Sequence, residues 1–377
     1  MKRRHVFFYK LARLLVIGFT KIKFGYRFQI AKDLPESYIV ISNHATDYDV
    51  LFVATSFKRQ MYFVGSSHIS RWGFASRLLE FCFAPIMRYK GASAASAVKD
   101  MAKKARKGEN VCLFAEGVRT WDGITCPIAP STAKLIKSLG CGLVTYKITG
   151  GYFASPMWAG ASIRRGSVQG APVSVLTKEQ LQEMSNEEIY EVLTRDLYED
   201  AYERQAASPE KYKGKNLAEG MENLLFVCPE CGERDSFESE QNQVSCKHCG
   251  LSFRYNEYGM LEGASFATLR DFAQWQLGKV EKHVEENEVY TAKHATLSEL
   301  KQQKDTLVAE GPVAFSKDGL VCGNVNIPMT SITDLAMHGR RAVVFTADKT
   351  YYEMIPAKGA NSLKFLLYYN EYKKAGR

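Results

Sequence analysis

Between residues 38 and 148, short apolar runs alternate with stretches of helical periodicity, and this alternation limits the folds that the chain can adopt. The apolar runs are rich in β-branched and aromatic residues and lie at 38–41, 61–64, 84–88, 110–114 and 143–148. Helical patterns separate several of them, at 72–81, 93–107 and 131–139. Strands that alternate with helices typically form a parallel sheet covered by helices. The sequence therefore predicts an α/β layered fold with a mainly parallel sheet.

A histidine with two carboxylates close behind it follows the first apolar run directly. The segment reads Ser42-Asn43-His44-Ala45-Thr46-Asp47-Tyr48-Asp49. Histidine can accept and return a proton near neutral pH, and a carboxylate on its second ring nitrogen fixes its tautomer. On an ideal helix Asp47 would lie near the face of His44, whereas Asp49 reaches His44 only if the histidine precedes the helix. The spacing leaves both carboxylates open, and a purely structural histidine is the alternative.

Two arginine-containing segments follow the next apolar runs. One is Pro85-Ile86-Met87-Arg88, and the other is Ala115-Glu116-Gly117-Val118-Arg119-Thr120. Glycine permits a sharp turn and the close approach of a ligand to the backbone. Arginine offers a permanently charged, forked donor that suits a phosphate. Each arginine alone is more typical of a structural or surface residue, so their order and spacing along the chain carry the interpretation.

Taken together, these segments resemble the glycerolipid acyltransferases of the lysophosphatidic acid acyltransferase (PlsC) type. The Asn-His-four residues-Asp pattern is similar to the first motif of that family, and this resemblance selects Asp49. The segment ending at Arg88 is similar to the intermediate motif. The segment 115–120 is similar to the motif Phe-Pro-Glu-Gly-Thr-Arg-Ser. Ala115 stands for the proline, Val118 for the threonine and Thr120 for the serine. The resemblance covers roughly residues 20–200, although 143–148 lacks the proline usual in the fourth motif.

The resemblance implies direct acyl transfer from acyl-coenzyme A or an acyl carrier protein. His44 would take the proton of the acceptor hydroxyl, and Asp49 would orient His44. The residues expected to bind or orient the acceptor are Asn43, Arg88, Glu116, Gly117 and Arg119, with Arg119 near the acceptor phosphate. Because no serine or cysteine is paired with the histidine in these motifs, an acyl-enzyme is not expected.

The acceptor implied by the resemblance is a lysophospholipid similar to 1-acyl-glycerol-3-phosphate, used in phospholipid biosynthesis. The segment 65–68 has no lysine where many family members carry a basic residue, so another lipid or glycolipid acceptor stays open. His68 in this segment has no carboxylate nearby and is expected to be structural. A non-catalytic membrane-binding scaffold is the alternative outside the enzymes, and the intact motif residues argue against it.

The net charge of +9 is concentrated at the start of the chain. Residues 1–32 hold nine basic and no acidic residues, leaving 41 of the 50 basic residues to balance 41 acidic ones. Such a local excess argues against a generally basic nucleic-acid-binding protein. It favours contact between this segment and an anionic membrane surface.

Residues 6–19 have helical apolar spacing with Lys10 and Arg13 on the polar side. A membrane-spanning helix needs about 20 largely apolar residues, and no cleavage site typical of a signal peptide follows. We therefore expect an amphipathic helix on the cytoplasmic face of a membrane, in a peripheral or monotopic protein. A helix packed on the protein's own core is the alternative. Residues 21–30 alternate polar and apolar side chains, which predicts a strand.

Four of the nine cysteines have the spacing of a metal site. They form two Cys-x-x-Cys pairs separated by 14 residues: Cys228, Cys231, Cys246 and Cys249. This pattern predicts a structural Zn²⁺ held by four thiolates in a zinc ribbon. Acidic residues crowd the segment, so we expect a structural or protein-docking role and no nucleic acid. The other cysteines are scattered, which indicates a reducing compartment.

The chain is long enough for several domains. We expect a basic membrane-contacting segment with the first strand at 1–32 and an acyltransferase domain at 33–203. A linker at 204–221, a zinc ribbon at 222–262 and a helical connector at 263–305 follow. Short strands and a final helix predict a small, mainly β domain at 306–377 that is similar to pleckstrin-homology domains.

Overall fold

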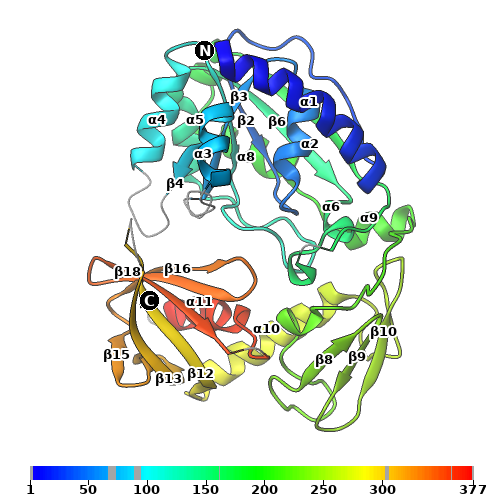
Figure 1. Ribbon diagram of the computed structural model, residues 1–377, viewed down its shortest axis with the longest axis vertical. Coiled ribbons are helices and arrows are strands. Elements are labelled where there is room, and N and C mark those ends of the chain that lie inside the picture. The colour runs from blue at the N-terminus through cyan, green and yellow to red at the C-terminus, as the bar shows by residue number, and fades with distance from the viewer. Residues whose placement is uncertain are drawn as a thin grey trace. The chain divides into compact units, whose positions relative to one another are not determined.

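The computed structural model describes residues 3–66, 74–88, 95–160, 162–301, 305–357 and 359–375 (Figure 1). Two compact units divide the chain. The first contains residues 1–157 and 161–214, and the second contains residues 158–160 and 215–377. His68 and the first residues of the helices expected from 72 and 93 lie outside the described residues.

The first unit is built on one sheet of seven strands. Their order is β1-β7-β6-β2-β5-β3-β4. The strands are β1 (Arg27–Phe28), β2 (Tyr38–Ser42), β3 (Met61–Ser66), β4 (Ile86–Arg88), β5 (Asn110–Phe114), β6 (Gly142–Thr149) and β7 (Gln169–Leu176). Every neighbouring pair is parallel except β6 and β7. The predicted α/β fold with a mainly parallel sheet is confirmed.

Successive strand residues point to opposite faces of a sheet, so continuous apolar strands expose apolar side chains on both faces. Helices cover both faces of this sheet. Ile39 and Ile41 of β2 join a buried cluster with residues of the helices of one layer. That layer consists of α4 (Ala95–Ala105), α5 (Ser131–Leu139), α7 (Lys178–Glu183) and α8 (Asn186–Leu197). On the other face the ring of Tyr38 packs against Phe57, at the end of α2 (Asp49–Ser56). The helix α1 (Arg3–Phe24) packs against α2 and against α3 (Phe74–Phe83). Two short helices, α6 (Gly151–Ala154) and α9 (Ala201–Ala207), lie in the later connections.

The N-terminal helix is longer than the sequence pattern predicts. It runs to Phe24, and the strand expected at 21–30 is reduced to Arg27–Phe28, so that expectation was wrong. Phe24 is fully buried, with its ring against Tyr48 and Phe52, which a helical continuation achieves. Gly25 ends the helix with φ +67°, where a side chain would clash with the carbonyl oxygen of Gly166. Within the described part of the chain, no helix is long and apolar enough to cross a membrane.

The second unit contains two antiparallel sheets. The smaller one has the order β11-β10-β9-β8, with β8 (Phe237–Glu240), β9 (Gln243–Cys246), β10 (Ser252–Tyr255) and β11 (Leu261–Glu262). The larger has the order β15-β14-β13-β12-β18-β17-β16. Its strands are β12 (Tyr290–Glu299), β13 (Thr306–Ser316), β14 (Gly319–Cys322), β15 (Val325–Pro328), β16 (Ile332–His338), β17 (Ala342–Ala347) and β18 (Thr350–Pro356). The expected C-terminal β domain is present, and α11 (Leu363–Ala375) packs on it through rings that contact Phe315.

Two of the expected connecting segments carry more structure than predicted. The boundary between the two units falls within the expected linker at 204–221, but part of this segment is packed, because Tyr212 is buried and its hydroxyl donates to the carbonyl oxygen of Ser167 at 3.0 Å. The connector expected at 263–305 holds the helix α10 (Leu269–Glu285), but its second half is strand β12. Alternating burial along β12, with Tyr290 and Ala292 inside, explains the strand. Both segments are rich in polar residues, so neither the packing of Tyr212 nor strand β12 was predicted from the sequence.

Candidate active site

The candidate site lies where β2 and β5 end. The two strands are parallel neighbours, and Ser42 pairs with Phe114 at their carboxyl ends. The loop 43–48 after β2 and the loop 115–120 after β5 therefore leave the sheet at the same edge. In open α/β sheets, ligands bind outside the carboxyl ends of the strands. The topology thus brings the two sequence motifs together.

Asp49 is the carboxylate partner of His44. The Nδ1 atom of His44 lies 2.8 Å from Oδ2 of Asp49, and Asp49 is fully buried as the first residue of α2. The same carboxylate accepts bonds from the backbone N–H groups of Ala45 and Thr46, at 2.7 and 2.9 Å, and from the Thr46 hydroxyl at 2.7 Å. With Nδ1 donating to Asp49, Nε2 is the nitrogen left to accept a proton. The structure thus resolves the ambiguity that the spacing left open.

The imidazole of His44 is positioned by packing as well as by this bond. Its ring stacks on Phe114 with a centroid distance of 4.5 Å and an interplanar angle of 23°. The side chain is 23% exposed, so a ligand can approach a ring whose partner is fully buried. A partly exposed histidine bonded to a buried carboxylate is an arrangement suited to general base chemistry.

Glu116 fixes the backbone of the His44 loop. Its Oε1 accepts the N–H of His44 and its Oε2 accepts the N–H of Cys126, each at 2.6 Å. Burial raises the pKa of Glu116 to about 8, although the two backbone donors act in the opposite direction. Both carboxylate oxygens are engaged with the backbone. Glu116 therefore braces the His44 loop against the segment that holds Cys126, and the expected contact with the acceptor stays a prediction.

Asn43 ties the same loop to β6. Its side-chain amide donates to the carbonyl oxygen of Ile148 and its side-chain oxygen accepts the N–H of Ile148, each at 2.8 Å. In addition, the N–H of Thr120 donates to the carbonyl oxygen of His44 at 3.2 Å. The loop that carries His44 is thus held from β6 on one side and from the 115–120 loop on the other.

The arginines lie next to this loop. Arg119 is 15% exposed, and its Nη1 lies 2.7 Å from Oδ2 of Asp47, which is 65% exposed. Gly117 has φ +70°, a conformation that favours glycine, and a Cβ at this position would lie 3.7 Å from Nη1 of Arg88. Arg88 and Arg119 therefore both lie at the edge that carries His44.

A small cavity adjoins His44. Besides Asn43, His44 and Glu116, its lining includes Gly151, Tyr152 and Glu199. Sequence reasoning missed Glu199, and it missed the bonds that Thr46, Cys126 and Ile148 supply to the site. Most of those bonds use backbone groups, which every residue carries, so no sequence signal marks them.

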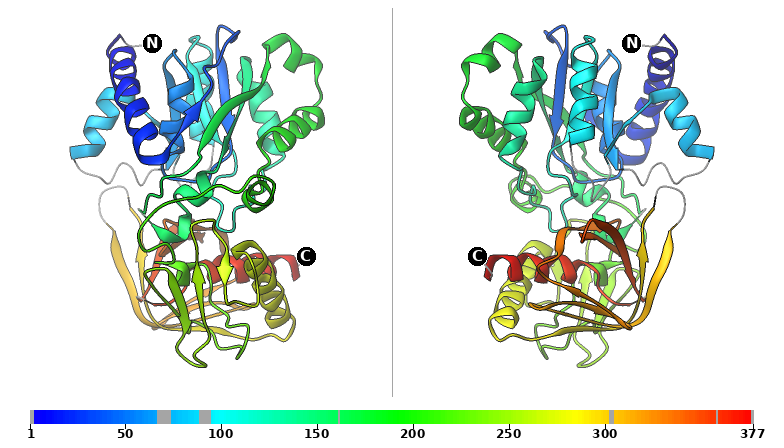
Figure 2. Two further views of the ribbon diagram at one scale, coloured as in Figure 1. Left: turned by 90° about the vertical axis from the view of Figure 1, so that its right-hand side faces the viewer. Right: turned by 90° about the vertical axis from the view of Figure 1, so that its left-hand side faces the viewer.

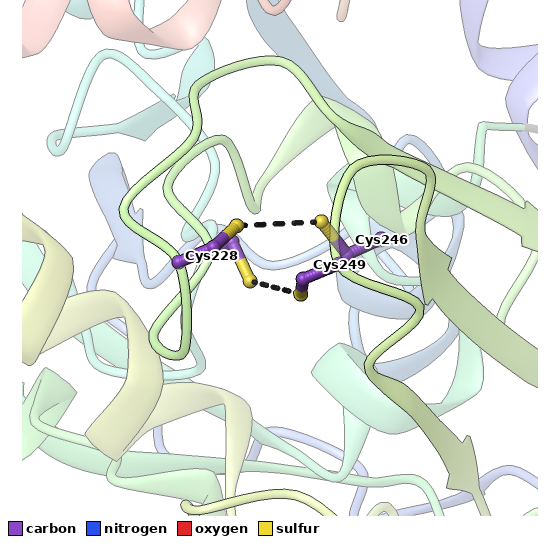
Figure 3. Close-up of side chains that lie close together, drawn as sticks. Cys228, Cys246 and Cys249 are labelled. Carbon is purple, nitrogen blue, oxygen red and sulfur yellow. Dashed lines mark hydrogen bonds between the residues drawn. The ribbon is translucent and has the colours of Figure 1, made fainter.

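The four predicted metal ligands converge in the second unit, and Figure 3 labels three of them, Cys228, Cys246 and Cys249. All four sulfur atoms lie within 4.8 Å of one another, with Cys228 and Cys249 3.7 Å apart and Cys231 and Cys246 3.9 Å apart. A tetrahedron of sulfurs around Zn²⁺ at about 2.3 Å has edges of about 3.8 Å, whereas a disulfide bond is only about 2.05 Å long. The cluster therefore fits a tetrahedral metal ion.

A match to a protein-family model agrees with part of this interpretation. Residues 26–149 match a family model described as acyltransferase, and this range contains His44, Asp49, Glu116 and both arginines. Among solved structures, the chain is similar to the 1-acyl-sn-glycerophosphate (LPA) acyltransferase PlsC from Thermotoga maritima. The sequence identity is 16% and the TM-score is 0.41, with 54% of this chain and 78% of that chain covered. No curated protein matches the chain.

Proposed function

We propose that the protein is a membrane-peripheral O-acyltransferase that esterifies the hydroxyl group of a lysophospholipid-like acceptor. The observation that carries this proposal is the pair of His44 and Asp49, with Nδ1 bonded to a buried carboxylate and Nε2 left to act as base. The match of residues 26–149 to the acyltransferase model supports the reaction class. The proposal also includes the identity of the acceptor, the identity of the acyl donor and the contact with a membrane.

The geometry suits direct transfer. Nε2 of His44 takes the proton of the acceptor hydroxyl while the hydroxyl oxygen attacks the thioester carbonyl carbon. The C–S bond then breaks, and the imidazolium returns the proton to the departing thiolate. Cys126 lies close to Glu116, but burial and that carboxylate raise the pKa of its thiol far above the ordinary value. It is therefore no activated nucleophile, and the chemistry needs no acyl-enzyme.

The two arginines define the acceptor subsite in this proposal. Arg88 and Arg119 carry permanent positive charge and forked donors, which match the oxygens of a phosphate group. Asn43 and Glu116 act by holding the loop that positions His44, and Gly117, with its positive φ, lets the backbone turn beside Arg88. An acceptor bound by its phosphate would thus present its free hydroxyl near His44.

The remaining parts of the chain support this reaction from outside the site. The basic, apolar helix α1 contacts the cytoplasmic surface of an anionic membrane, where the acceptor resides. Zn²⁺ occupies the four-cysteine cluster and supplies folding energy to the surrounding ribbon. The ribbon and the β domain, which is similar to pleckstrin-homology domains, serve as structural or docking modules.

The direct test is thiol release from acyl-coenzyme A with a panel of lysolipid acceptors in vesicles. We expect turnover that requires an acceptor and that falls by about a thousandfold or more in His44→Ala, because the base is removed. His294→Ala is the matched control, since His294 is 44% exposed and lies in the β domain.

Undiminished turnover in His44→Ala would overturn the assignment of the base. If no acceptor supports turnover with acyl-coenzyme A, the assay is repeated with an acyl carrier protein as donor. Failure with both donors would contradict the enzyme proposal and favour a lipid-binding scaffold.

A further inference from the structure

One side of α3 carries an exposed apolar stripe. Phe74, Leu78 and Phe81 recur at i, i+4 and i+7, which places them on one side of the helix, and they are 80%, 51% and 50% exposed. Ser76, on the opposite side of the helix, is buried. A surface helix of a soluble protein normally directs its apolar stripe inward and its polar side outward. Here the outward side carries two phenylalanines and a leucine.

The neighbouring helix α1 repeats this arrangement. Phe7, Leu11, Leu14 and Ile22 are 63%, 47%, 67% and 70% exposed, and their spacing places them in one stripe along the helix. The opposite side of α1 is buried through His5, Tyr9, Thr20 and Phe24. The exposed stripe is therefore additional to the apolar side with which α1 packs on the unit.

The two exposed stripes lie on helices that touch. The rings of Phe8 and Phe81 meet edge to face with centroids 6.0 Å apart, and the guanidinium of Arg4 lies 4.4 Å from the centre of the Phe81 ring. Figure 2 shows α1 and α3 side by side along one side of the first unit. We call these exposed side chains the α1–α3 surface: Phe7, Leu11, Leu14, Leu15, Ile22, Phe74, Leu78 and Phe81. Single exposed apolar residues are ordinary, but a contiguous patch marks an interaction site.

The charges around this surface indicate what covers it. Arg3, Lys10 and Lys21 are exposed along one edge of α1, and residues 1–32 contain no acidic residue. On α3 the exposed Arg77 and Glu80 balance each other, so the surface as a whole stays positive. A twofold contact between two copies would bring like patches together and oppose these positive charges. An anionic bilayer instead accepts apolar side chains in its acyl region and attracts lysine and arginine to its headgroups. The charge pattern thus favours a lipid surface over a second copy.

We propose that α3 is a second membrane-contacting helix, and that Phe74, Leu78 and Phe81 insert beside α1 into an anionic bilayer face. This inference extends the membrane contact of α1, which is part of the proposed function. One helix lying in the interface leaves the unit free to rotate about the helix axis, whereas two helices fix its orientation. Both contacting helices are coupled to the site: α1 packs on α2, which begins at Asp49, and β4 after α3 ends at Arg88.

The test is flotation of the full-length protein with vesicles made of equal parts of phosphatidylcholine and phosphatidylglycerol. The variant Phe74→Ser/Leu78→Ser should partition into vesicles at least about tenfold more weakly, because two interfacial side chains are lost. The matched control is Val289→Ser/Leu307→Ser, which removes side chains of 51% and 58% exposure from the second unit and should bind like the wild type.

The outcomes separate this inference from the proposed function. If Leu14→Ser/Leu15→Ser loses binding while the α3 variant keeps it, α3 does not contact lipid and the role of α1 stands. If the wild type fails to bind vesicles, both the inference and the proposed membrane contact fail. Sedimentation without lipid tests the rival occupant, since a wild-type dimer that the α3 variant converts to a monomer would assign the surface to a second copy.

A site-directed probe guards against a variant that simply misfolds. Tryptophan introduced as Phe74→Trp retains an apolar ring, and its fluorescence should be quenched by vesicles whose phosphatidylcholine carries brominated acyl chains. Val289→Trp, on an exposed residue of the second unit, should give no additional quenching. Equal quenching of the two variants, after subtraction of the wild-type signal, would contradict the insertion of α3.

Discussion

The loop that carries His44 and the two Cys-x-x-Cys segments are both short and rich in reactive side chains. They differ in the interactions available to stabilise them. Buried carboxylates hold the His44 loop: Asp49 accepts four hydrogen bonds and Glu116 accepts two, and every donor except the N–H of Cys126 belongs to this loop. The cysteine cluster places four equivalent thiols face to face. Thiolates brought so close repel one another unless a cation lies between them.

This difference predicts two kinds of sensitivity. The first loop is complete within the protein, so its geometry depends on individual side-chain bonds that mutation can remove one at a time. In the proposed function Zn²⁺ completes the cluster, so the order of the cluster depends on a ligand from solution. The first should respond to substitutions and pH, and the second to metal availability.

Metal removal should give the largest effect. Treatment with a strong zinc chelator, or Cys246→Ser, should abolish the order of β8–β11, because structural Zn²⁺ contributes about 10 kcal/mol or more to small zinc domains. Amide hydrogen exchange over residues 237–262 measures this loss. The loop 43–48 should keep its protection, since the described bonds that hold it come from the first unit.

The order of β8–β11 does not depend on a metal if zinc analysis of the purified protein finds no bound metal and the amides of these strands remain protected. Chelator added to Cys246→Ser supplies the control. It should cause no further change, because the site has already lost a ligand.

Glu116→Gln should give the next largest effect and should reveal itself in the pH dependence of stability. Burial raises the pKa of folded Glu116 to about 8, from an ordinary value of 4.5. The folded state therefore binds the proton more tightly, and the associated stability is present below about pH 4.5 and lost as the pH rises through about 8. The variant removes this titration, so its free energy of unfolding should fall less steeply between those values.

Denaturant unfolding at a series of pH values measures the two slopes. The variant should also be less stable by about 1–3 kcal/mol at low pH, because its amide nitrogen faces a backbone N–H donor. Glu80→Gln, an exposed residue of α3, is the control and should leave the slope unchanged. Equal slopes for Glu116→Gln and the wild type would show that this carboxyl does not titrate there.

The sequence predicted the parts of this molecule that depend on residue type and periodicity. Alternating runs gave the parallel sheet, and the Cys-x-x-Cys spacing gave the convergence of four thiols. It failed where the outcome depended on tertiary contacts. Residues 21–24 alternate like a strand but remain helical because Phe24 packs on Tyr48 and Phe52.

The same limit applies within the candidate site. Spacing alone could not choose between Asp47 and Asp49, because the choice depends on where α2 begins. The roles of Glu116 and Asn43 as braces also depend on backbone groups of Cys126 and Ile148, which are distant in the sequence. Motifs identified which residues gather at the site, and only the fold showed what each one contacts.

Asp47→Asn should give the smallest effect. It tests whether the exposed ion pair of the His44 loop matters less than the buried hydrogen bonds of the same loop. Asp47 is 65% exposed and pairs with Arg119 at 2.7 Å. Exposed ion pairs contribute less than about 1 kcal/mol, so the melting temperature should hardly change. Removing the competing carboxylate leaves Arg119 free for an acceptor phosphate, which should lower KM for a phosphate-bearing acceptor by about two- to fivefold while kcat is unchanged. Asp100→Asn, on the exposed side of α4, is the control, and an acceptor without a phosphate should show no change. A rise in KM would reverse the interpretation: Asp47 would then hold Arg119 in its binding position, and the rim of the loop would be organised by bonds of the same kind as its interior.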